Sequence, residues 1–148
     1  MTVEEDGAPS FENWDWADRQ AEEFEASGGT RAGTIRGVPI VVVSCIGARS
    51  GRRRHVALMR VEHGGEYALV ASKGGNARNP GWYHSIVKNP EVFLRDGAVR
   101  KAYRAREVAG PERELWWERA VRVWPDYADY ARSTERTIPV FVLTPSEG

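Results

Sequence analysis

The stretch GARSGRRRHVALMRVEHGGEYALVASKGGNARNPGWY, residues 47–83, decides the fold, and the rest of the chain is arranged around it. It opens with a turn rich in glycine and arginine, residues 47–54. Two strand-like segments follow, residues 55–63 and 66–72, and the glycine pair between them can supply the positive φ angles of a tight hairpin turn. The sequence therefore predicts an antiparallel hairpin that begins and ends at a glycine-rich loop.

The loops at the two ends of this hairpin carry the same chemistry. The first offers Arg49, Ser50 and Arg54, and the second follows Ser72 with Lys73 and two glycines. Cations and hydroxyls beside accessible backbone N–H groups form charge-assisted hydrogen bonds with phosphates and carboxylates. If the two segments pair, the loops lie at neighbouring strand ends. The pattern predicts a cradle for a long, flat anion, with a solvated basic turn or a nucleic-acid patch as the alternatives.

The composition of the 148-residue chain limits the kind of protein. Its 21 basic and 21 acidic residues balance, so no overall field attracts nucleic acid, and we expect no nucleic-acid partner. The only cysteine, Cys45, lies in an apolar run and is expected to be buried. No run is long enough to span a membrane. Because the N-terminus is acidic and lacks a signal-peptide core, we expect a cytoplasmic protein, at most weakly associated with a membrane surface.

The remaining sequence alternates short strands and helices. We expect a tail and amphipathic helix over residues 1–30 and one barrel domain over residues 31–148. Residues 38–46 are β-branched and nearly all apolar, as in a strand buried on both faces. The absence of regular βαβ units favours a mainly β, α+β fold: an antiparallel split β-barrel of about six strands with flanking helices. The inward faces expected for the helices are Phe11, Trp14, Ala17, Ala21 and Phe24 in the first, and Leu115, Trp116, Ala120 and Val123 in the one after Pro111.

No cluster of side chains predicts catalysis by itself. The three histidines, at positions 55, 63 and 84, lack the spacing of metal ligands, so no metal is expected. The sequence also lacks a G-x-S-x-G nucleophile elbow and a credible cysteine–histidine pair. If the chain is an enzyme, a cofactor must therefore supply the difficult chemistry.

A series of short motifs runs in order through the chain. They are GARSGRRR at 47–54, ASKGG at 71–75, NPGWY at 79–83, WPDYADY at 124–130 and RTIPVFVL at 136–143. The series, over about residues 38–145, resembles the actinobacterial deazaflavin-dependent nitroreductase and quinone reductase family. Members of that family use the deazaflavin coenzyme F-420. The family commonly has proline where Ala57 stands, and Trp124 replaces a tyrosine of its nitroreductase-type members.

The resemblance implies a fold and an activity. The fold is a split β-barrel of the flavin-reductase type, and such barrels are often dimers, so a homodimer is compatible with it. The activity is hydride transfer from reduced F-420 to a small electron-poor acceptor such as a quinone, an enone or a nitro compound. A barrel that uses FMN or FAD is one alternative, and a coenzyme-binding protein without turnover is another.

The resemblance also implies which residues form the site. A hydroxyl of Ser72, Tyr127 or Tyr130 would stabilise or protonate the oxyanion formed on the acceptor. Met59, Trp124 and Tyr130 would form the acceptor pocket. The residues expected to bind the coenzyme are Ala48, Arg49, Ser50, Arg54, His55, Val56, Ala57, Leu58, Met59, Val70, Ala71, Ser72, Lys73, Gly81, Trp82, Tyr83, Ser85 and Tyr127.

Overall fold

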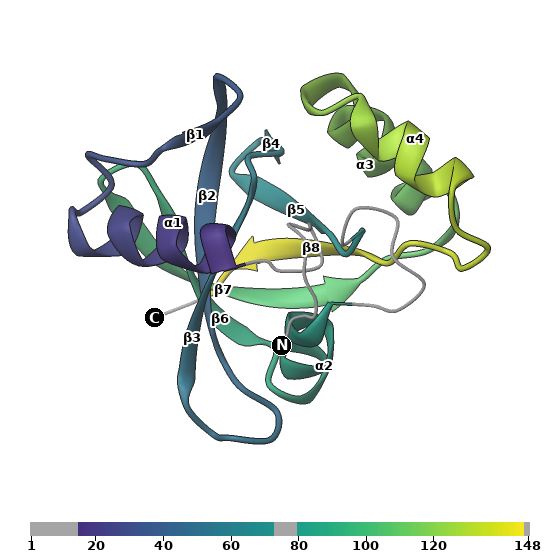
Figure 1. Cartoon of the computed structure of the whole chain (residues 1–148). Helices are drawn as coiled ribbons and strands as arrows, with labels where there is room; N and C mark the ends of the chain where they lie inside the picture. The colour runs from purple at the N-terminus through teal and green to yellow at the C-terminus, as the bar shows by residue number, and fades with distance from the viewer. Residues whose placement is uncertain (1–14, 73–79, 147–148) are drawn as a thin grey trace.

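The computed structural model describes residues 15–72 and 80–146, which fold around one curled antiparallel sheet (Figure 1). The strands are β1 (Thr34–Ile35), β2 (Val38–Ile46), β3 (Arg53–Met59), β4 (Glu62–His63), β5 (Glu66–Val70), β6 (Glu91–Asp96), β7 (Val99–Glu107) and β8 (Val140–Pro145). They follow the order β1-β2-β6-β7-β8-β5-β4, and β3 also pairs with β2. The expected α+β class and split-barrel architecture are confirmed.

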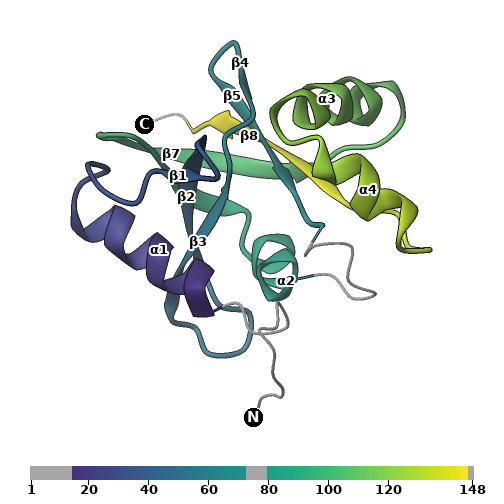
Figure 2. The ribbon, with the colours of Figure 1, turned by 45° about the horizontal axis from the view of Figure 1, so that its top comes forward.

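Four helices, counted within the described ranges, surround this sheet. They are α1 (Asp15–Ala26), α2 (Gly81–Lys88), α3 (Gly110–Val123) and α4 (Asp126–Arg132). Figure 2 shows α1 on one side of the strands and the α3–α4 pair on the other, with α2 near the opening between β3 and β5. In the part of the chain that the structure describes, no helix combines the length and the apolar character needed to cross a bilayer.

Strand β2 has the bounds that its apolar run predicted, and it is buried on both faces. Val41, Val43 and Cys45 point into the curled sheet, where they pack with residues of α2. Ile40 and Val42 point outward and pack beneath the helices. Alternate side chains of a strand face opposite sides, so a strand between two apolar layers is apolar along nearly its whole length, and the one buried polar residue of β2, Ser44, is hydrogen-bonded. Strand β2 therefore contributes side chains to both hydrophobic cores, one inside the curled sheet and one beneath the helices.

The sequence predicted that residues 55–63 pair with residues 66–72 in one long hairpin, and this pairing is wrong. Strand β3 pairs along its whole length with β2, from Ile40 opposite Met59 to Ile46 opposite Arg53. Only the short β4 forms a hairpin with β5, around a glycine pair whose φ angles of 61° and 86° fit the expected tight turn. The nine residues of β2 offer β3 a longer apolar partner than the five residues of β5, which was the predicted partner.

Other local predictions are confirmed. Strands β6 and β7 form the expected hairpin, with Asp96 opposite Val99. Helix α1 ends before two glycines of positive φ, and Ala21 and Phe24 are buried as expected. Phe11 and Trp14 lie outside the described residues. Of the predicted inward face of α3, Trp116 and Ala120 are buried and Val123 is partly buried, but Leu115 is 47% exposed and that assignment is wrong.

Polar contacts join three strands at one end of the sheet. The Nε atom of Arg60, just after β3, lies 3.0 and 2.9 Å from the two carboxylate oxygens of Asp96 at the end of β6. The hydroxyl of Tyr67 in β5 donates a 2.5 Å hydrogen bond to the same carboxylate. The backbone N–H of Ala68 also donates to the Val61 carbonyl at 2.9 Å. The curled sheet is therefore closed near the β3–β4 connection, and β3 and β5 diverge from there.

Candidate active site

The two strands that diverge from the closed end leave a split in the barrel wall. Within the described residues, β3 pairs only with β2, and β5 pairs only with β4 and β8. Figure 2 shows the far ends of β3 and β5 separated, with the start of α2 between them. Two strand edges therefore face each other across the split with backbone groups that can bind a ligand.

The register identifies the backbone groups that face the split. The Arg60 N–H donates to the Pro39 carbonyl at 3.1 Å, so alternation along an antiparallel ladder directs the backbone of Ala57 and Met59 away from β2. On β5, the Ala68 N–H donates to Val61, on the side away from β8. Val70 lies two residues further along the strand, so its backbone N–H and C=O also face away from β8 and toward the split. The split thus presents N–H and C=O groups from both edges.

A pocket of about 680 Å³ occupies this split and extends toward α4. Its volume falls within the range of ligand-binding pockets, roughly 300–1,000 Å³. Val56, Ala57 and Leu58 of β3, all half-buried, contribute to its lining. The full lining is Ala17, Asp18, Ile35, Arg36, Arg54, Val56, Ala57, Leu58, Met59, Val70, Ser72, Pro80, Gly81, Trp82, Trp124, Asp126, Tyr127 and Tyr130.

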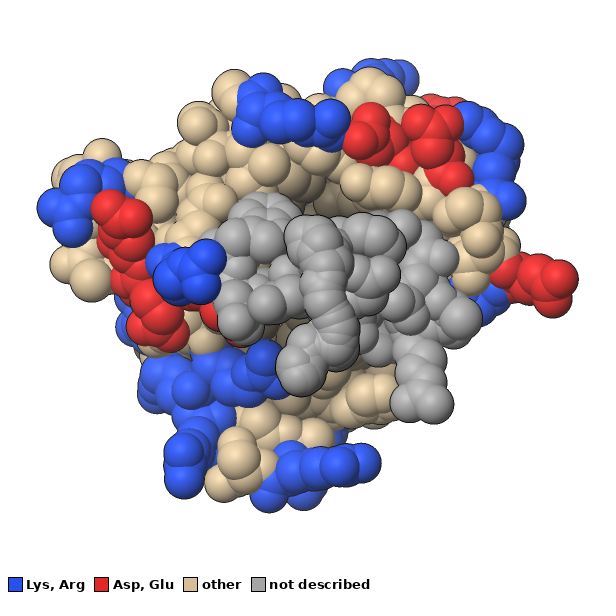
Figure 3. Space-filling view, viewed as in Figure 1, with Lys and Arg blue, Asp and Glu red and all other residues tan. Residues whose placement is uncertain are grey.

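One end of the pocket is basic and lies where β3 and α2 begin. Arg54 is exposed there, and a Cβ added to Gly81 would lie 3.5 Å from its Nη1 atom, so the guanidinium sits beside the start of α2. The backbone N–H of Ala48 donates to Ser85 Oγ at 3.2 Å, and Lys88 Nζ donates to the Ala48 carbonyl at 3.0 Å. These bonds hold the β2–β3 loop against α2. In Figure 3 basic side chains gather at this lower edge of the molecule.

The other end of the pocket is aromatic and is built by the α3–α4 junction. Pro125 separates the two helices, as its sequence position predicted, and places Trp124 and Tyr127 in the pocket wall. The rings of Tyr127 and Tyr130 pack edge to face with centroids 6.1 Å apart. Tyr127 is 4% exposed. Burial, with a smaller contribution from Tyr130, raises the pKa of Tyr127, so its hydroxyl stays protonated at neutral pH.

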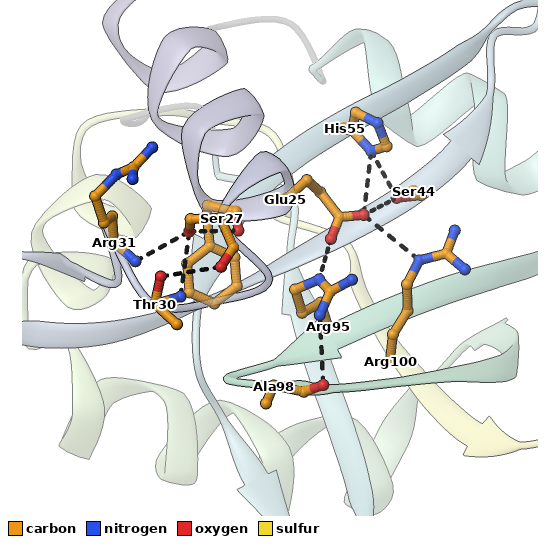
Figure 4. Close-up of polar contacts among 10 residues, drawn as sticks. Glu25, Ser27, Thr30, Arg31, Ser44, His55, Arg95, Ala98 and Arg100 are labelled. Carbon is orange, nitrogen blue, oxygen red and sulfur yellow. Dashed lines mark hydrogen bonds and ion pairs between the residues drawn. The ribbon is translucent and has the colours of Figure 1, made fainter.

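Helix α1 supplies a third wall, and Glu25 anchors it. Figure 4 shows the Glu25 carboxylate pointing from α1 toward the sheet, where it forms ion pairs with Arg95 and Arg100. It also lies 3.3 Å from Ser44 Oγ and 3.7 Å from His55 Nδ1. This cluster fixes the end of α1 over β3, while Ala17 and Asp18, two turns earlier, reach the pocket.

The structure brings many of the sequence-predicted residues together. Met59, Trp124 and Tyr130, predicted for the acceptor, share the pocket with Ser72 and Tyr127. Those predicted for the coenzyme that line it are Arg54, Val56, Ala57, Leu58, Met59, Val70, Ser72, Gly81, Trp82 and Tyr127.

Other predicted coenzyme residues lie beside the pocket and do not line it. The imidazole of His55 bonds to Ser44 Oγ at 2.7 Å beneath α1, so only its backbone is directed toward the split. Tyr83 packs its ring against Phe141, with centroids 5.5 Å apart. Ala48, Arg49, Ser50, Ala71 and Ser85 are also absent from the lining, and Lys73 lies outside the described residues.

Sequence reasoning missed several pocket residues. Ile35 at the end of β1 and Arg36 in the β1–β2 turn line the pocket, and no motif in the sequence marks either as a binding residue. Ala17 was expected to pack and Asp18 to be solvated, yet both reach the pocket. Asp126 stood inside the WPDYADY motif but was assigned no role.

The curled antiparallel sheet, its split and the basic-to-aromatic pocket define a split barrel of the flavin-reductase type. The family model for the F420H(2)-dependent quinone reductases matches residues 16–145. The chain therefore belongs to the F420H(2)-dependent quinone reductase family. It is an oxidoreductase with coenzyme F-420 as its cofactor and a quinone as hydride acceptor.

Individual relatives and solved structures are similar to most of the chain. The chain is 35% identical over 114 residues to an F420H(2)-dependent quinone reductase of Mycobacterium tuberculosis (strain ATCC 25618 / H37Rv), covering 72% of this chain and 73% of the relative. It is 48% identical to a solved F420-H2 dependent reductase, FDR-A, with a TM-score of 0.68 and coverage of 72% and 94%. It is 43% identical to a solved domain-swapped dimer, with a TM-score of 0.71 and coverage of 93% and 100%.

The residues of the pocket fit this coenzyme. A flat ring needs an apolar slot, which Val56, Leu58 and Val70 supply, and polar ring atoms need the N–H and C=O groups directed into the split. An acidic tail needs cations at the pocket rim, and Arg54 lies there. The site therefore has an apolar centre and a basic exit, as a ring with an anionic tail requires.

Proposed function

We propose that the coenzyme ring binds along the free edge of β3, its tail leaves past Arg54, and the quinone binds against the aromatic end of the pocket. The observation that carries this proposal is that one continuous pocket joins Arg54 to Tyr130. Arg54 and Met59 lie five residues apart on β3, about 16 Å along an extended strand. That length accommodates the coenzyme ring and the quinone in contact. The guanidinium of Arg54 then lies outside the apolar part of the pocket.

When bound, reduced F-420 supplies the hydride that the quinone accepts. The chain's part is to hold both partners and to exclude water. The side chains of Val56, Leu58 and Trp82 fix the ring, and the backbone groups of Ala57 and Val70 orient it. Holding two reactants in contact converts a bimolecular step into an effectively unimolecular one, which accelerates the reaction without an activated side chain.

Tyrosine hydroxyls stabilise and neutralise the negative charge that develops on the quinone oxygen. A quinone that accepts a hydride carries a negative oxygen until it gains a proton. Because burial raises the pKa of Tyr127, we assign its hydroxyl as a fixed hydrogen-bond donor to that oxygen. Tyr130 is only partly buried, so we assign its hydroxyl as the group that gives a proton and regains one from solvent. Ser72 Oγ is a second candidate donor at the pocket wall.

A homodimer is the assembly that we propose for this chain. The 43% identical structure described as a domain-swapped dimer supports it. Among the described residues, Val87 and Val99 are large apolar side chains that stay more than half exposed. Light scattering after size-exclusion chromatography tests this, and a mass near 16.6 kDa would show a monomer.

A two-part experiment tests the proposed function. The coenzyme-free chain is titrated with oxidised F-420 and, in parallel, with FMN, following the fluorescence of each. Single-turnover oxidation of bound F-420H2 by menadione is then followed by stopped flow. We expect tighter binding of F-420 than of FMN and rapid oxidation by the quinone. Equal or tighter FMN binding, or F-420 binding without quinone-dependent oxidation, would overturn the proposal.

A further inference from the structure

The tip of the β1–β2 hairpin carries an arginine in an unusual backbone conformation. The turn consists of Arg36 and Gly37, between the paired residues Ile35 and Val38. Their φ angles are 49° and 78°, as in a two-residue hairpin turn whose two central residues are left-handed. Glycine suits the first position, and asparagine and aspartate are tolerated there because their short side chains hydrogen-bond locally. Arginine has the Cβ clash without that compensation, so it strains the position. The conformation of Arg36 thus carries a cost that the hairpin itself does not require.

The side chain of Arg36 reaches across to the aromatic end of the pocket. Its Cζ atom lies 4.1 Å from the centroid of the Trp124 ring, within the range of a cation–π contact. Its Nη2 atom lies 2.6 Å from Asp126 Oδ2, a residue 90 positions further along the chain. Ile35, Arg36, Trp124 and Asp126 all line the pocket. The guanidinium therefore connects two walls of the pocket that come from distant parts of the sequence.

This bridge lies at the end of the pocket away from Arg54. Ile40 of β2 pairs with Met59, the last residue of β3, and the β1–β2 tip extends beyond that pair. Arg54 lies at the other end of β3. Figure 1 likewise shows the β1–β2 tip and the β2–β3 loop at opposite ends of the molecule. The bridge is therefore on the acceptor side of the pocket and not on the side of the coenzyme tail.

The bridge is built from groups that can separate without unfolding the chain. The side chains of Arg36 and Asp126 are 63% and 38% exposed. Exposed ion pairs contribute little to stability. Arg36 occupies a strained turn position and forms an exposed ion pair, yet it joins two walls of the pocket, so its effect on the pocket explains it best.

We propose that Arg36, held by Asp126 and Trp124, closes the acceptor end of the pocket and sets the size of quinone that can enter. This inference rests on the proposed function, because it assumes that the aromatic end receives the acceptor. With the bridge intact, compact quinones bind in the closed pocket. Quinones with a bulky ring substituent or an isoprenoid chain must first break the bridge, so their binding is penalised.

The test compares two quinones of different size on variants of the bridge. Arg36→Gly removes the side chain and suits the left-handed turn, so its melting temperature should equal or exceed that of the wild type. Asp126→Asn removes the ion pair but leaves Arg36 and Trp124. Arg31→Ala is the matched control, because Arg31 forms a similarly exposed ion pair, with Glu23, outside the pocket lining.

The first readout is quinone binding to the coenzyme-free chain, measured by quenching of tryptophan fluorescence. We expect Arg36→Gly to lower the Kd of an isoprenoid-substituted quinone roughly tenfold while the Kd of menadione changes less than threefold. The ratio of kcat/KM values for the two quinones should shift in the same direction. Asp126→Asn should give a smaller shift, Arg31→Ala none, and the Kd of F-420 should stay within threefold in every variant.

The outcomes separate this inference from the proposed function. If Arg36→Gly changes both quinones equally, or neither, the bridge does not select by size and the inference is wrong even though turnover persists. If wild type binds F-420 but no quinone oxidises it, the proposed function fails. The quinone affinities of the coenzyme-free chain then still decide whether Arg36 restricts entry to the pocket.

Discussion

The carboxylate of Glu25 forms an ion pair with the guanidinium of Arg95, and this contact joins the end of α1 to strand β6 (Figure 4). Both side chains are largely buried, with exposed fractions of 12% and 16%. Arg100 and His55 add positive or ionisable groups around the same carboxylate. The helix that forms one wall of the pocket is thus fixed by charge as well as by the buried ring of Phe24.

Replacing Glu25 by glutamine should destabilise the fold at neutral pH by about 1.5–3 kcal/mol, because a charged hydrogen bond is lost and two arginines remain without a counter-charge. Chemical unfolding measures this change in the free energy of unfolding. Glu23→Gln is the control, since Glu23 forms an exposed pair with Arg31 and its loss should cost little.

The stabilisation from Glu25 should depend on pH. Burial disfavours its charged form, but the hydrogen bond from Arg95 and the charges of Arg95, His55 and Arg100 outweigh this, so the pKa of Glu25 is lowered from 4.5. A lowered pKa gives stabilisation that is complete above the unfolded value and is lost as pH falls through the folded value. The difference between wild type and Glu25→Gln should therefore shrink below about pH 4.5. A constant difference from pH 3 to 7 would contradict this.

Arg54→Ala should weaken the binding of oxidised F-420 by roughly 10- to 100-fold, because a charge-assisted hydrogen bond to the anionic tail is worth about 1.5–3 kcal/mol. Fluorescence titration measures the Kd, and raising the salt concentration should weaken wild-type binding more than that of the variant. Arg122→Ala is the control, since this arginine is exposed on α3 and does not line the pocket. Equal loss in both variants would point to a general charge effect.

Tyr127→Phe and Tyr130→Phe should keep the Kd of F-420 within about threefold, a change below ~1 kcal/mol. At least one should slow single-turnover oxidation by a quinone roughly tenfold, equal to about 1.4 kcal/mol of barrier. If Tyr130 transfers the proton, the solvent isotope effect on single-turnover oxidation should be smaller in Tyr130→Phe than in the wild type. Unchanged rates in both variants would show that the hydroxyls have no chemical role, and early melting would show that they act in packing.

The thiol of Cys45 should be inert in the folded chain. The side chain is 1% exposed, and burial raises its pKa even though the charge of Arg54 opposes this. Since the thiolate is the reactive form, a thiol reagent such as iodoacetamide should label the folded chain very slowly. Labelling in urea, which exposes the thiol, is the control. Fast labelling without denaturant would mean that β2 opens locally.

Local sequence determined several elements because the signals needed were close together in the chain. The apolar run of β2 fixed its bounds, since a strand between two cores cannot alternate with polar residues. Gly97 permitted the β6–β7 turn, and Pro125 separated α3 from α4, because both act through their own backbone angles. The ordered motifs identified the family, and the pocket includes Ser72, Trp124 and Tyr127.

Only the tertiary structure decided which strand pairs with β3 and which side chains complete the pocket. The sequence made the adjacent segment the natural partner, but β2 offered a longer apolar edge, and that long-range choice left β3 free to face β5. The contacts of Arg36 with Asp126 and of Glu25 with Arg95 span 90 and 70 residues. No local pattern encodes such pairs, because they form only when the curled sheet brings distant turns and helices together.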